Sequence, residues 1–318
     1  MRIGTLARTA AGINIKPKRN VWKRIKRHWQ LYLVVLLPLT YIIIFKYIPM
    51  LGTAIAFKDY NVIKGIWGSP WAGMTYFNQF FESPNFWLYI KNTIGISLYG
   101  IAVGFPAPII LAIALNEIRN GPFKKTVQMA TYAPYFISTV IMVSIIMMSL
   151  LPEVGLISKF LGMLGVANTN FMGIPKLFKT IYVMSDVWQY SGYSAVIYIA
   201  ALAGVNPELY ESAKVDGASR LQKIINVDIP SLIPVSVILL ILSVGNIMKV
   251  GVEKIFLMQN MLNLSSSEVI STYVYKVGLL NASYSFSAAI GLFNSLVNLL
   301  LLVLVNQVAK KISGSSLW

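Results

Sequence analysis

Long apolar segments constrain this 318-residue sequence more than any other feature. A helix that crosses the hydrocarbon core of a bilayer needs about 20 mostly apolar residues. The chain holds six candidate segments, at residues 31–47, 90–115, 126–151, 180–204, 232–248 and 283–305. The first is short for a full span and could lengthen through residues 48–57, although we expect Pro49 and Gly52 to break it. The sequence therefore predicts an all-α, polytopic membrane protein with six transmembrane helices.

Composition supports the membrane class and excludes several kinds of site. Hydrophobic residues make up 56% of the chain and charged residues only 12%, whereas soluble domains carry about 25% charged residues. The chain has no cysteine and a single histidine, His28. Disulfides, thiolate metal sites and metal sites built on several histidines are therefore excluded.

The positions of the basic residues orient the chain in the membrane. Cytoplasmic loops are enriched in lysine and arginine. Seventeen of the 27 basic residues, including every arginine, lie in the N-terminal segment, the second and fourth connections and the C-terminal tail. Basic residues at both ends fit an even number of spans, so we expect both termini in the cytoplasm. This topology explains the net charge of +16 without a nucleic-acid partner.

The two segments next to the first span each allow two interpretations. Val21, Trp22, Ile25 and Trp29 recur at helical spacing among basic residues, which is typical of a short interfacial helix. A basic flank that anchors the first span explains the pattern equally well. The connection at residues 52–89 is rich in aromatic side chains, which favours an interfacial belt over a surface that receives a partner.

The chain has no ATP-binding motif that could power transport. A phosphate-binding P-loop requires G-x-x-x-x-G-K-[ST], and no Gly-Lys dipeptide occurs in the sequence. Ionisable residues within spans mark proton and ion paths. Asp186 lies near the start of the fourth span and Lys249 just past the fifth, so we expect no carboxylate at depth. Active transport would then need energy from another chain.

The connection between the fourth and fifth spans has strong local signals. Asn206 is a good N-cap, Pro207 suits the first helical position, and Glu208 favours the positive helix end. Gly217 suits the left-handed turn that ends such a helix. A second short helix should follow and stop before Pro230. The segment is predicted to form a helix-turn-helix on the cytoplasmic face.

This connection resembles the EAA loop of the permease subunits of bacterial binding-protein-dependent ABC importers. The family pattern is E-A-A-x3-G-x9-I-x-L-P, and the chain departs from it at three positions by Ser for Ala, Val for Ile and Ile for Leu. The residues that carry the match, and that the resemblance implies contact the ATPase, are Glu211, Ser212, Ala213, Asp216, Gly217, Ala218 and Pro230.

Two further stretches are similar to one subgroup of these permeases. Residues 78–87, followed by Asn92 and Thr93, look like the entry to the second span in sugar permeases of this group. Residues 245–256 are similar to the LplB-type permeases for oligosaccharides and polysaccharide fragments. The resemblance covers nearly the whole chain after about residue 25 and implies a type I ABC importer permease fold.

The resemblance also implies an organisation and a set of partners. The predicted parts are a basic N-terminal segment at 1–30, a transmembrane domain at 31–308 with a coupling loop at 205–230, and a cytoplasmic tail at 309–318. The coupling helix would dock on a cytoplasmic ATPase dimer, which binds ATP and magnesium, so this chain needs no cofactor. An ATPase dimer offers two grooves and the chain has one loop, which requires a second permease subunit. An extracytoplasmic binding protein would deliver the sugar to this multi-pass protein of the bacterial plasma membrane.

Amides and aromatic rings at midplane depth are candidates for a sugar path, because sugars need hydrogen bonds and stacking surfaces. The candidates are Trp188, Gln189, Tyr190, Tyr193, Asn246, Asn294 and Asn298. Asn294 and Asn298 share one helix face. Hydrogen bonds between neighbouring helices are an equally good role for such residues.

Two other classes of function remain open at this point. One is a passive channel or secondary transporter, which a carboxylate at depth would favour. The other is a scaffold subunit of a membrane complex, against which the spacing of the loop motif argues.

Overall fold

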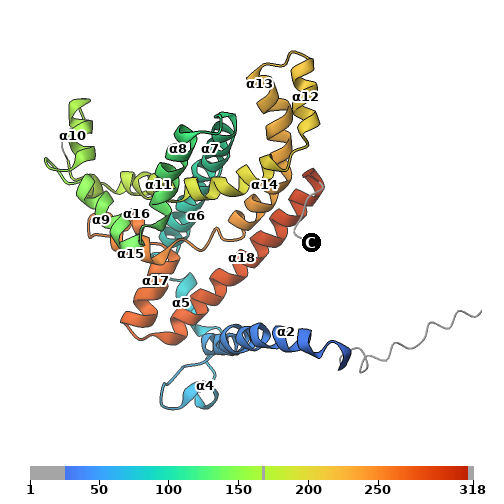
Figure 1. Cartoon of the computed structure of the whole chain (residues 1–318). Coiled ribbons are helices and arrows are strands. Elements are labelled where there is room, and N and C mark those ends of the chain that lie inside the picture. The colour runs from blue at the N-terminus through green and yellow to red at the C-terminus, as the bar shows by residue number, and fades with distance from the viewer. Residues whose placement is uncertain (1–25, 167–168, 314–318) are drawn as a thin grey trace, which may run out of the picture. The chain divides into compact units, whose positions relative to one another are not determined.

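The structure is a computed structural model that describes residues 26–166 and 169–313. Within those residues the chain is helical, and the only β contact is an isolated bridge between Lys58 and Trp71 (Figure 1). The chain divides into two compact units, one ending at Thr53 and the other beginning at Ala54. All-α architecture is therefore confirmed for the described part of the chain.

The first apolar run is helical throughout from Trp29 to Phe57. It comprises α2 (Trp29–Ile42), a π-helical turn η1 (Ile43–Tyr47), α3 (Ile48–Met50) and a 3₁₀ helix η2 (Leu51–Phe57). The predicted break at Pro49 and Gly52 is wrong. Pro49 lies two residues after the end of the π turn, where the hydrogen-bonding register already changes, so its missing N–H does not stop the helix.

Of the predicted interfacial helix before this run, only Trp29 is described, as the first residue of α2. Val21, Trp22 and Ile25 lie outside the described residues.

The second and third predicted spans differ in their continuity. The second is a run from Phe86 to Glu117, formed by α6 (Phe86–Gly104) and α7 (Pro106–Glu117). The third, predicted as one span, is instead α8 (Pro122–Tyr132) and η3 (Ala133–Phe136), followed by α9 (Thr139–Ser149) at a bend of 106°. Ser138 starts α9 afresh, since its hydroxyl accepts a hydrogen bond from the Ile141 N–H.

Among the predictions for the last three long helices, the one at Pro230 needs correction. The fourth candidate is α11 (Pro175–Ala203), and the sixth is α18 (Tyr284–Ser313). The predicted stop before Pro230 is wrong, because α13 (Arg220–Lys223), the π turn η5 (Ile224–Asp228) and α14 (Ile229–Val244) form one run. The π turn changes the bonding register just before Pro230, which lets the helix continue.

Four described runs are long and apolar enough to cross a membrane, or five if the bent pair of α8 and α9 forms one span. These four are Trp29–Phe57, Phe86–Glu117, Arg220–Val244 and Tyr284–Lys311. Helix α11 is not among them, although its 29 residues correspond to about 44 Å at 1.5 Å per residue. It carries Asp186 and two lysines. The count of six spans stays a prediction.

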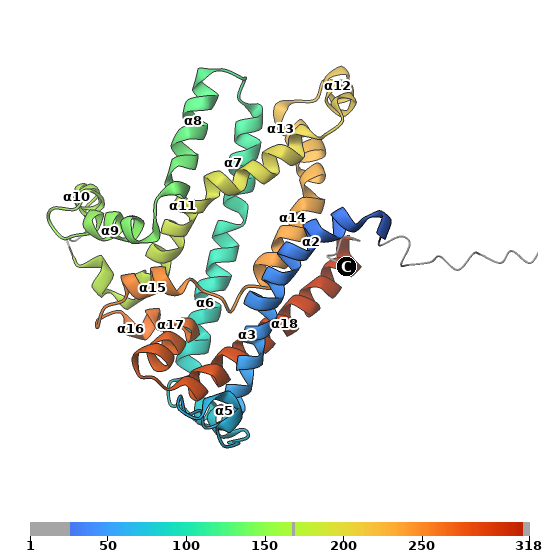
Figure 2. The same cartoon turned by 60° about the horizontal axis from the view of Figure 1, so that its bottom comes forward.

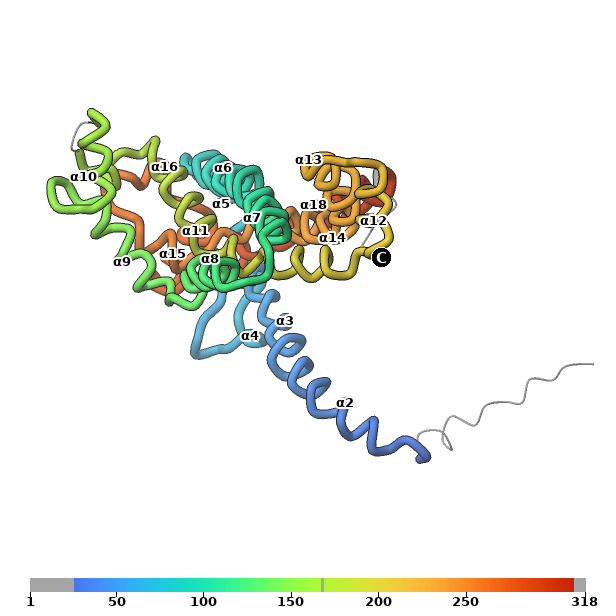
Figure 3. Tube along the Cα trace, turned by 45° about the horizontal axis from the view of Figure 1, so that its top comes forward, coloured from blue at the N-terminus to red at the C-terminus, as the bar shows by residue number. Residues whose placement is uncertain are grey.

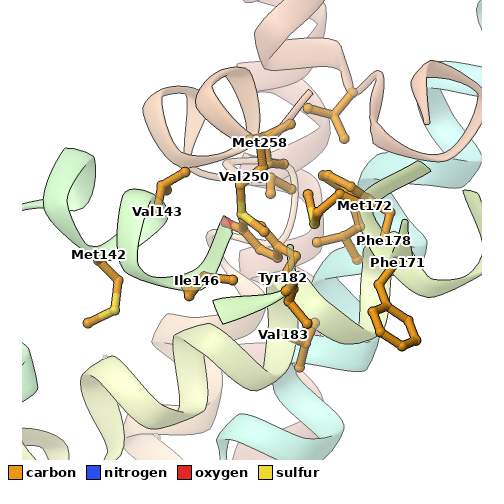
Figure 4. Packing of buried hydrophobic residues seen from close by; sticks show 14 residues of the cluster. Met142, Val143, Ile146, Phe171, Met172, Phe178, Tyr182, Val183, Val250 and Met258 are labelled. Carbon is orange, nitrogen blue, oxygen red and sulfur yellow. The ribbon is translucent and has the colours of Figure 1, made fainter. Parts of the chain in front are cut away.

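In the second unit, α11 is the central helix. It packs on α6, α7 and α8, while α14 packs on α18 (Figure 2). Gly192 allows α11 to cross the end of α8 closely, since a Cβ there would lie 1.9 Å from the Thr131 carbonyl oxygen. The largest buried cluster joins α9 and α11 to the short helix α15 (Val252–Met258) around Phe178, Tyr182 and Met258 (Figure 4).

Short helices stand at the end of this unit opposite α12 (Pro207–Val215) (Figure 2). They are α5 (Thr75–Phe81), α16 (Leu264–Ser267), α17 (Ile270–Tyr275) and the π turn η6 (Lys276–Leu280). Side chains of α6 hold two of them. Asn92 donates to the carbonyls of Ser265 and Glu268, and the Thr93 hydroxyl accepts from the Ile270 N–H.

The aromatic connection has both buried and exposed rings. Phe80 packs edge-on against Phe86 and Phe293, at centroid distances of 5.0 and 5.7 Å. Trp67, within α4 (Gly65–Gly68), is 80% exposed, and Trp71 is 70% exposed. The remaining short elements, α10 (Leu156–Met163) and η4 (Phe171–Gly173), lie in the connection before α11.

Candidate functional site

A cavity of about 900 Å³ lies in the second unit beside α11. Its wall is built by α6, α7, α9, α11 and α14, by the segment that leads from α14 into α15, and by the first turn of α15. The polar side chains on this wall are those of Ser97, Thr139, Tyr182, Asp186, Tyr190, Ser191, Ser194, Tyr198, Ser243, Asn246, Lys249, Glu253 and Lys254. Hydroxyl, amide and charged groups thus face one space among long apolar helices.

An ion pair anchors this wall. The Lys254 ammonium contacts Asp186 Oδ1 at 2.6 Å and lies 5.5 Å from the Tyr182 ring centroid. Lys254 is only 4% exposed, whereas the Asp186 side chain retains 33% exposure. Burial of a charge is costly unless it is paired, so these two residues hold α15 against α11.

The expectation that no carboxylate lies at membrane depth stays a prediction. Asp186 lies within α11, which is not among the described helices long and apolar enough to cross a membrane, and it lines the cavity. Its partner Lys254 was not predicted from the sequence, because the two residues are 68 positions apart. The pairing neutralises Asp186, which distinguishes it from the free carboxylate of a proton path.

Of the predicted sugar-path residues in α11, only Tyr190 lines the cavity. Gln189 is buried behind the wall, where it donates to the Ile137 carbonyl at 3.1 Å and accepts from Lys254 at 3.5 Å. Tyr193 stacks on Tyr135 at a centroid distance of 3.9 Å. Trp188 is about half exposed and does not line the cavity.

The three predicted asparagines gather near the end of α14. Asn246 lines the cavity and donates to the Leu242 carbonyl at 2.8 Å. Asn298 accepts from the Met248 N–H at 3.1 Å, and Asn294 donates to the Met248 carbonyl at 3.3 Å. Asn294 and Asn298 therefore connect α18 to the segment after α14, which is the alternative role considered for them. Asn298 also lines a second hollow of about 260 Å³, together with Asn246.

The second candidate site is the loop around α12. The Asn206 side chain accepts from the Glu208 N–H at 3.1 Å, as expected for an N-cap. After α12, Gly217 has a φ of 71° and the Ala218 N–H reaches back to the Ala213 carbonyl at 2.9 Å. This left-handed closure is the one the sequence predicts. The Ser219 and Gln222 side chains then cap α13 reciprocally.

The predicted loop residues fall into two groups by exposure. Glu211, Ser212, Asp216, Gly217 and Pro230 are exposed, whereas Ala213 and Ala218 are half-buried. Val215 is 88% exposed and Leu221 is 65% exposed. The loop thus exposes two large apolar side chains close in sequence to the exposed charges of Asp216 and Arg220. Figure 3 shows α12 and α10 at opposite sides of the second unit.

The inner side of α12 is attached to the fifth apolar segment. The Tyr210 hydroxyl donates to Asp228 Oδ1 at 2.5 Å, and Asp228 is fully buried. Burial, together with the hydrogen bond and the charge of Asp228, raises the pKa of Tyr210 to about 12. The Tyr210 hydroxyl therefore stays protonated at neutral pH and can donate its hydrogen bond to Asp228. Lys223 and Glu117 form a looser ion pair nearby, at 3.9 Å.

A helical unit with a polar cavity beside its central helix and an exposed, capped loop at one end has the features expected of a membrane permease. Residues 104–314 match the family described as binding-protein-dependent transport system inner membrane component. The match covers most of the chain and includes the α12 loop and, apart from α6, the helices of the cavity wall. The chain therefore belongs to this family.

Relatives from Bacillus subtilis (strain 168) match nearly end to end. The polygalacturonan/rhamnogalacturonan transport system permease protein YteP is 40% identical over 95% of this chain and 94% of its own length. Protein LplB is 38% identical over 92% of each chain.

Two solved structures have the same fold. The crystal structure of a bacterial ABC transporter involved in the import of the acidic polysaccharide alginate matches with a TM-score of 0.85 and 37% identity. That match covers 92% of this chain and 99% of the other. The bacterial alginate ABC transporter in complex with its alginate pentasaccharide-bound periplasmic protein matches with a TM-score of 0.86 and 36% identity, over 93% and 99% of the two chains.

The chain is thus a multi-pass permease subunit of a binding-protein-dependent ABC transporter in the bacterial plasma membrane. Permease subunits of this class are not enzymes. ATP hydrolysis belongs to a partner ATPase.

Proposed function

We propose that this chain forms one half of the translocation path of an ATP-driven importer of oligosaccharides or polysaccharide fragments. The observation that carries the proposal is the pairing of two sites in one compact unit: a polar cavity beside α11 and a partner-facing loop at α12. Transport needs the first site, and coupling to an external motor needs the second.

The substrate class is supported by the chemistry of the cavity. Sugars present hydroxyls, which Tyr190, Asn246 and the serines of the wall can hydrogen-bond, and apolar faces, which tyrosine rings can stack on. A volume of about 900 Å³ lies within the range of about 300–1,000 Å³ typical of small-molecule sites. Two similar proteins are described as handling polygalacturonan or rhamnogalacturonan and alginate, which are polysaccharides.

The partners follow from the loop and from the family. The helix α12 would dock in a groove of a cytoplasmic ATPase, with Glu211 and the exposed Val215 on its outer face. A dimeric ATPase offers two grooves, and this chain presents one loop, so a second permease subunit would complete the transporter. A sugar-binding protein would deliver the substrate from the other side of the membrane. In this arrangement both termini are cytoplasmic.

The loop can be tested by two variants in the assembled transporter. Gly217→Pro removes the left-handed turn, since proline fixes φ near −65°, and Glu211→Lys reverses an exposed charge. Neither change touches the cavity, so both proteins should insert and pair normally. Both should lose ATPase binding in a pull-down, or substrate-stimulated ATP hydrolysis in proteoliposomes.

Matched controls lie in α10 and in the turn after it. Gly165 also has a positive φ, of 83°, and Lys159 is an exposed charge on α10. Gly165→Pro and Lys159→Glu should keep ATPase binding. If the loop variants bound the ATPase and hydrolysed ATP as the controls do, α12 would not be the coupling element.

A further inference from the structure

A buried carboxylate lies where the α12 loop joins the fifth apolar segment. Asp228 is the last residue of the π turn η5, and its side chain is fully buried. Its Oδ1 accepts the Tyr210 hydroxyl at 2.5 Å, and its Oδ2 has no hydrogen-bond partner among the described residues. A buried acidic group with one short hydrogen bond depends strongly on that partner.

Tyr210 is the inward-facing attachment of α12. It is half-buried, while its neighbours Leu209 and Glu211 are exposed. The side chain of Asn116, at the end of α7, also hydrogen-bonds Tyr210, and the charge of Glu117 acts on it. One hydroxyl therefore joins three segments: the coupling helix, the end of α7 and the π turn.

The covalent route from α12 to the fifth segment is short but compliant. It runs through residues 216–219, where Gly217 forms the left-handed turn and lies in open space, since a Cβ there would meet no atom within 4 Å. A displacement of α12 can therefore be absorbed by rotation at Gly217. A side-chain link that bypasses this turn would carry the displacement directly into η5.

We propose that Tyr210 and Asp228 are a positioning pair that transmits movement of the coupling helix to the fifth apolar segment. The inference rests on the proposed function, since it assumes that α12 docks on an ATPase. The pair is distinct from the docking face, because Glu211 and Val215 are exposed while Tyr210 is half-buried and Asp228 is fully buried. Without the pair, the ATPase still docks and hydrolyses ATP, but the membrane helices no longer change conformation with each cycle of ATP hydrolysis.

The π turn explains why this link would act at Asp228. Its wider turn uses i→i+5 hydrogen bonds and marks a local change of register within an α-helical run. Pro230, two residues later, contributes no N–H donor to that region. A pull at Asp228 therefore acts on the least regular point of the run from Arg220 to Val244.

The test uses the complete transporter in proteoliposomes, with substrate uptake and ATP hydrolysis measured on the same sample. Tyr210→Phe removes only the hydroxyl. We expect ATPase pull-down to be unchanged and the number of substrate molecules imported per ATP to fall about fivefold, the factor that corresponds to one ordinary hydrogen bond. Asp228→Ala should behave in the same way.

Two further variants separate transmission from general damage. Asp228→Asn keeps an acceptor oxygen for Tyr210 and should restore most of the coupling that Asp228→Ala loses. The double variant of Tyr210→Phe and Asp228→Ala should be no worse than either single variant, because both remove the same link. Tyr284→Phe, at the start of α18, is the matched control and should couple normally.

Three outcomes decide the matter. Normal import per ATP in both Tyr210→Phe and Asp228→Ala would overturn the positioning role while leaving the proposed function intact. Loss of ATPase binding in these variants would also overturn it, since the pair would then serve docking. If the unaltered transporter imported nothing with ATP, the proposed function itself would fail, and the positioning role with it.

Discussion

Lys254→Met removes the ammonium from the ion pair on the cavity wall and keeps a side chain of similar length. Asp186 then loses the partner at 2.6 Å and remains as an unpaired carboxylate inside α11. Removing one partner of a buried pair costs about 3–5 kcal/mol. Because the Asp186 side chain is 33% exposed to the cavity, solvent screening favours the lower end, about 3 kcal/mol.

A loss of about 3 kcal/mol lowers the ratio of folded to unfolded protein by roughly two orders of magnitude. The measurement is unfolding of the purified permease in detergent, followed by denaturant and by heat. For a chain of this size the melting temperature should fall by on the order of 5 °C. The double variant of Asp186→Asn and Lys254→Met removes both charges and should recover most of the loss.

Lys249→Met is the matched control, since Lys249 lines the same cavity but is exposed. It should change the free energy of unfolding by less than about 1 kcal/mol. The ion pair would have no such stabilising role if Lys254→Met proved as stable as Lys249→Met, or if the double variant were destabilised as much as Lys254→Met alone.

The remaining predictions concern a helix crossing, the topology and the cavity. Gly192→Ala should lower the free energy of unfolding by about 1–3 kcal/mol, because the new Cβ meets the Thr131 carbonyl. Gly291 has open space around it, so Gly291→Ala should be neutral or slightly stabilising in the same unfolding assay. The chain has no cysteine, so Arg119→Cys and Arg220→Cys each introduce a single thiol. Each should react with a membrane-impermeant thiol reagent only after the cells are permeabilised, and labelling in sealed cells would reject the topology. Tyr190→Ala should raise the substrate concentration for half-maximal uptake with little change in ATPase binding, and an unchanged value would remove Tyr190 from the path.

Local chemistry made the α12 loop predictable. Capping by Asn206 and the left-handed turn at Gly217 depend on side chains and backbone within a few residues, and the structure has both. The end of the second helix was not predictable in the same way. Pro230 is a stop signal in an ordinary α-helix, and the π turn that lets the helix pass it has no comparable local signature.

The cavity depended on contacts that the sequence does not show. Asp186 and Lys254 lie on different elements, and only the packing of α15 against α11 brings them together. Asn294 and Asn298 were correctly placed on one helix face, but both turn to the backbone of Met248. The bend between α8 and α9 likewise interrupts a segment whose hydropathy alone suggested one continuous span.

The energy for import through this permease subunit is expected to come from ATP hydrolysed by another chain. Uptake of labelled oligosaccharide into sealed vesicles that contain the full transporter and the binding protein separates this source from a proton gradient. We predict uptake that requires ATP and the partner ATPase, and that persists when an uncoupler abolishes the proton gradient at constant ATP. Uptake that continued without the ATPase and collapsed with the uncoupler would show that the chain is a secondary transporter instead.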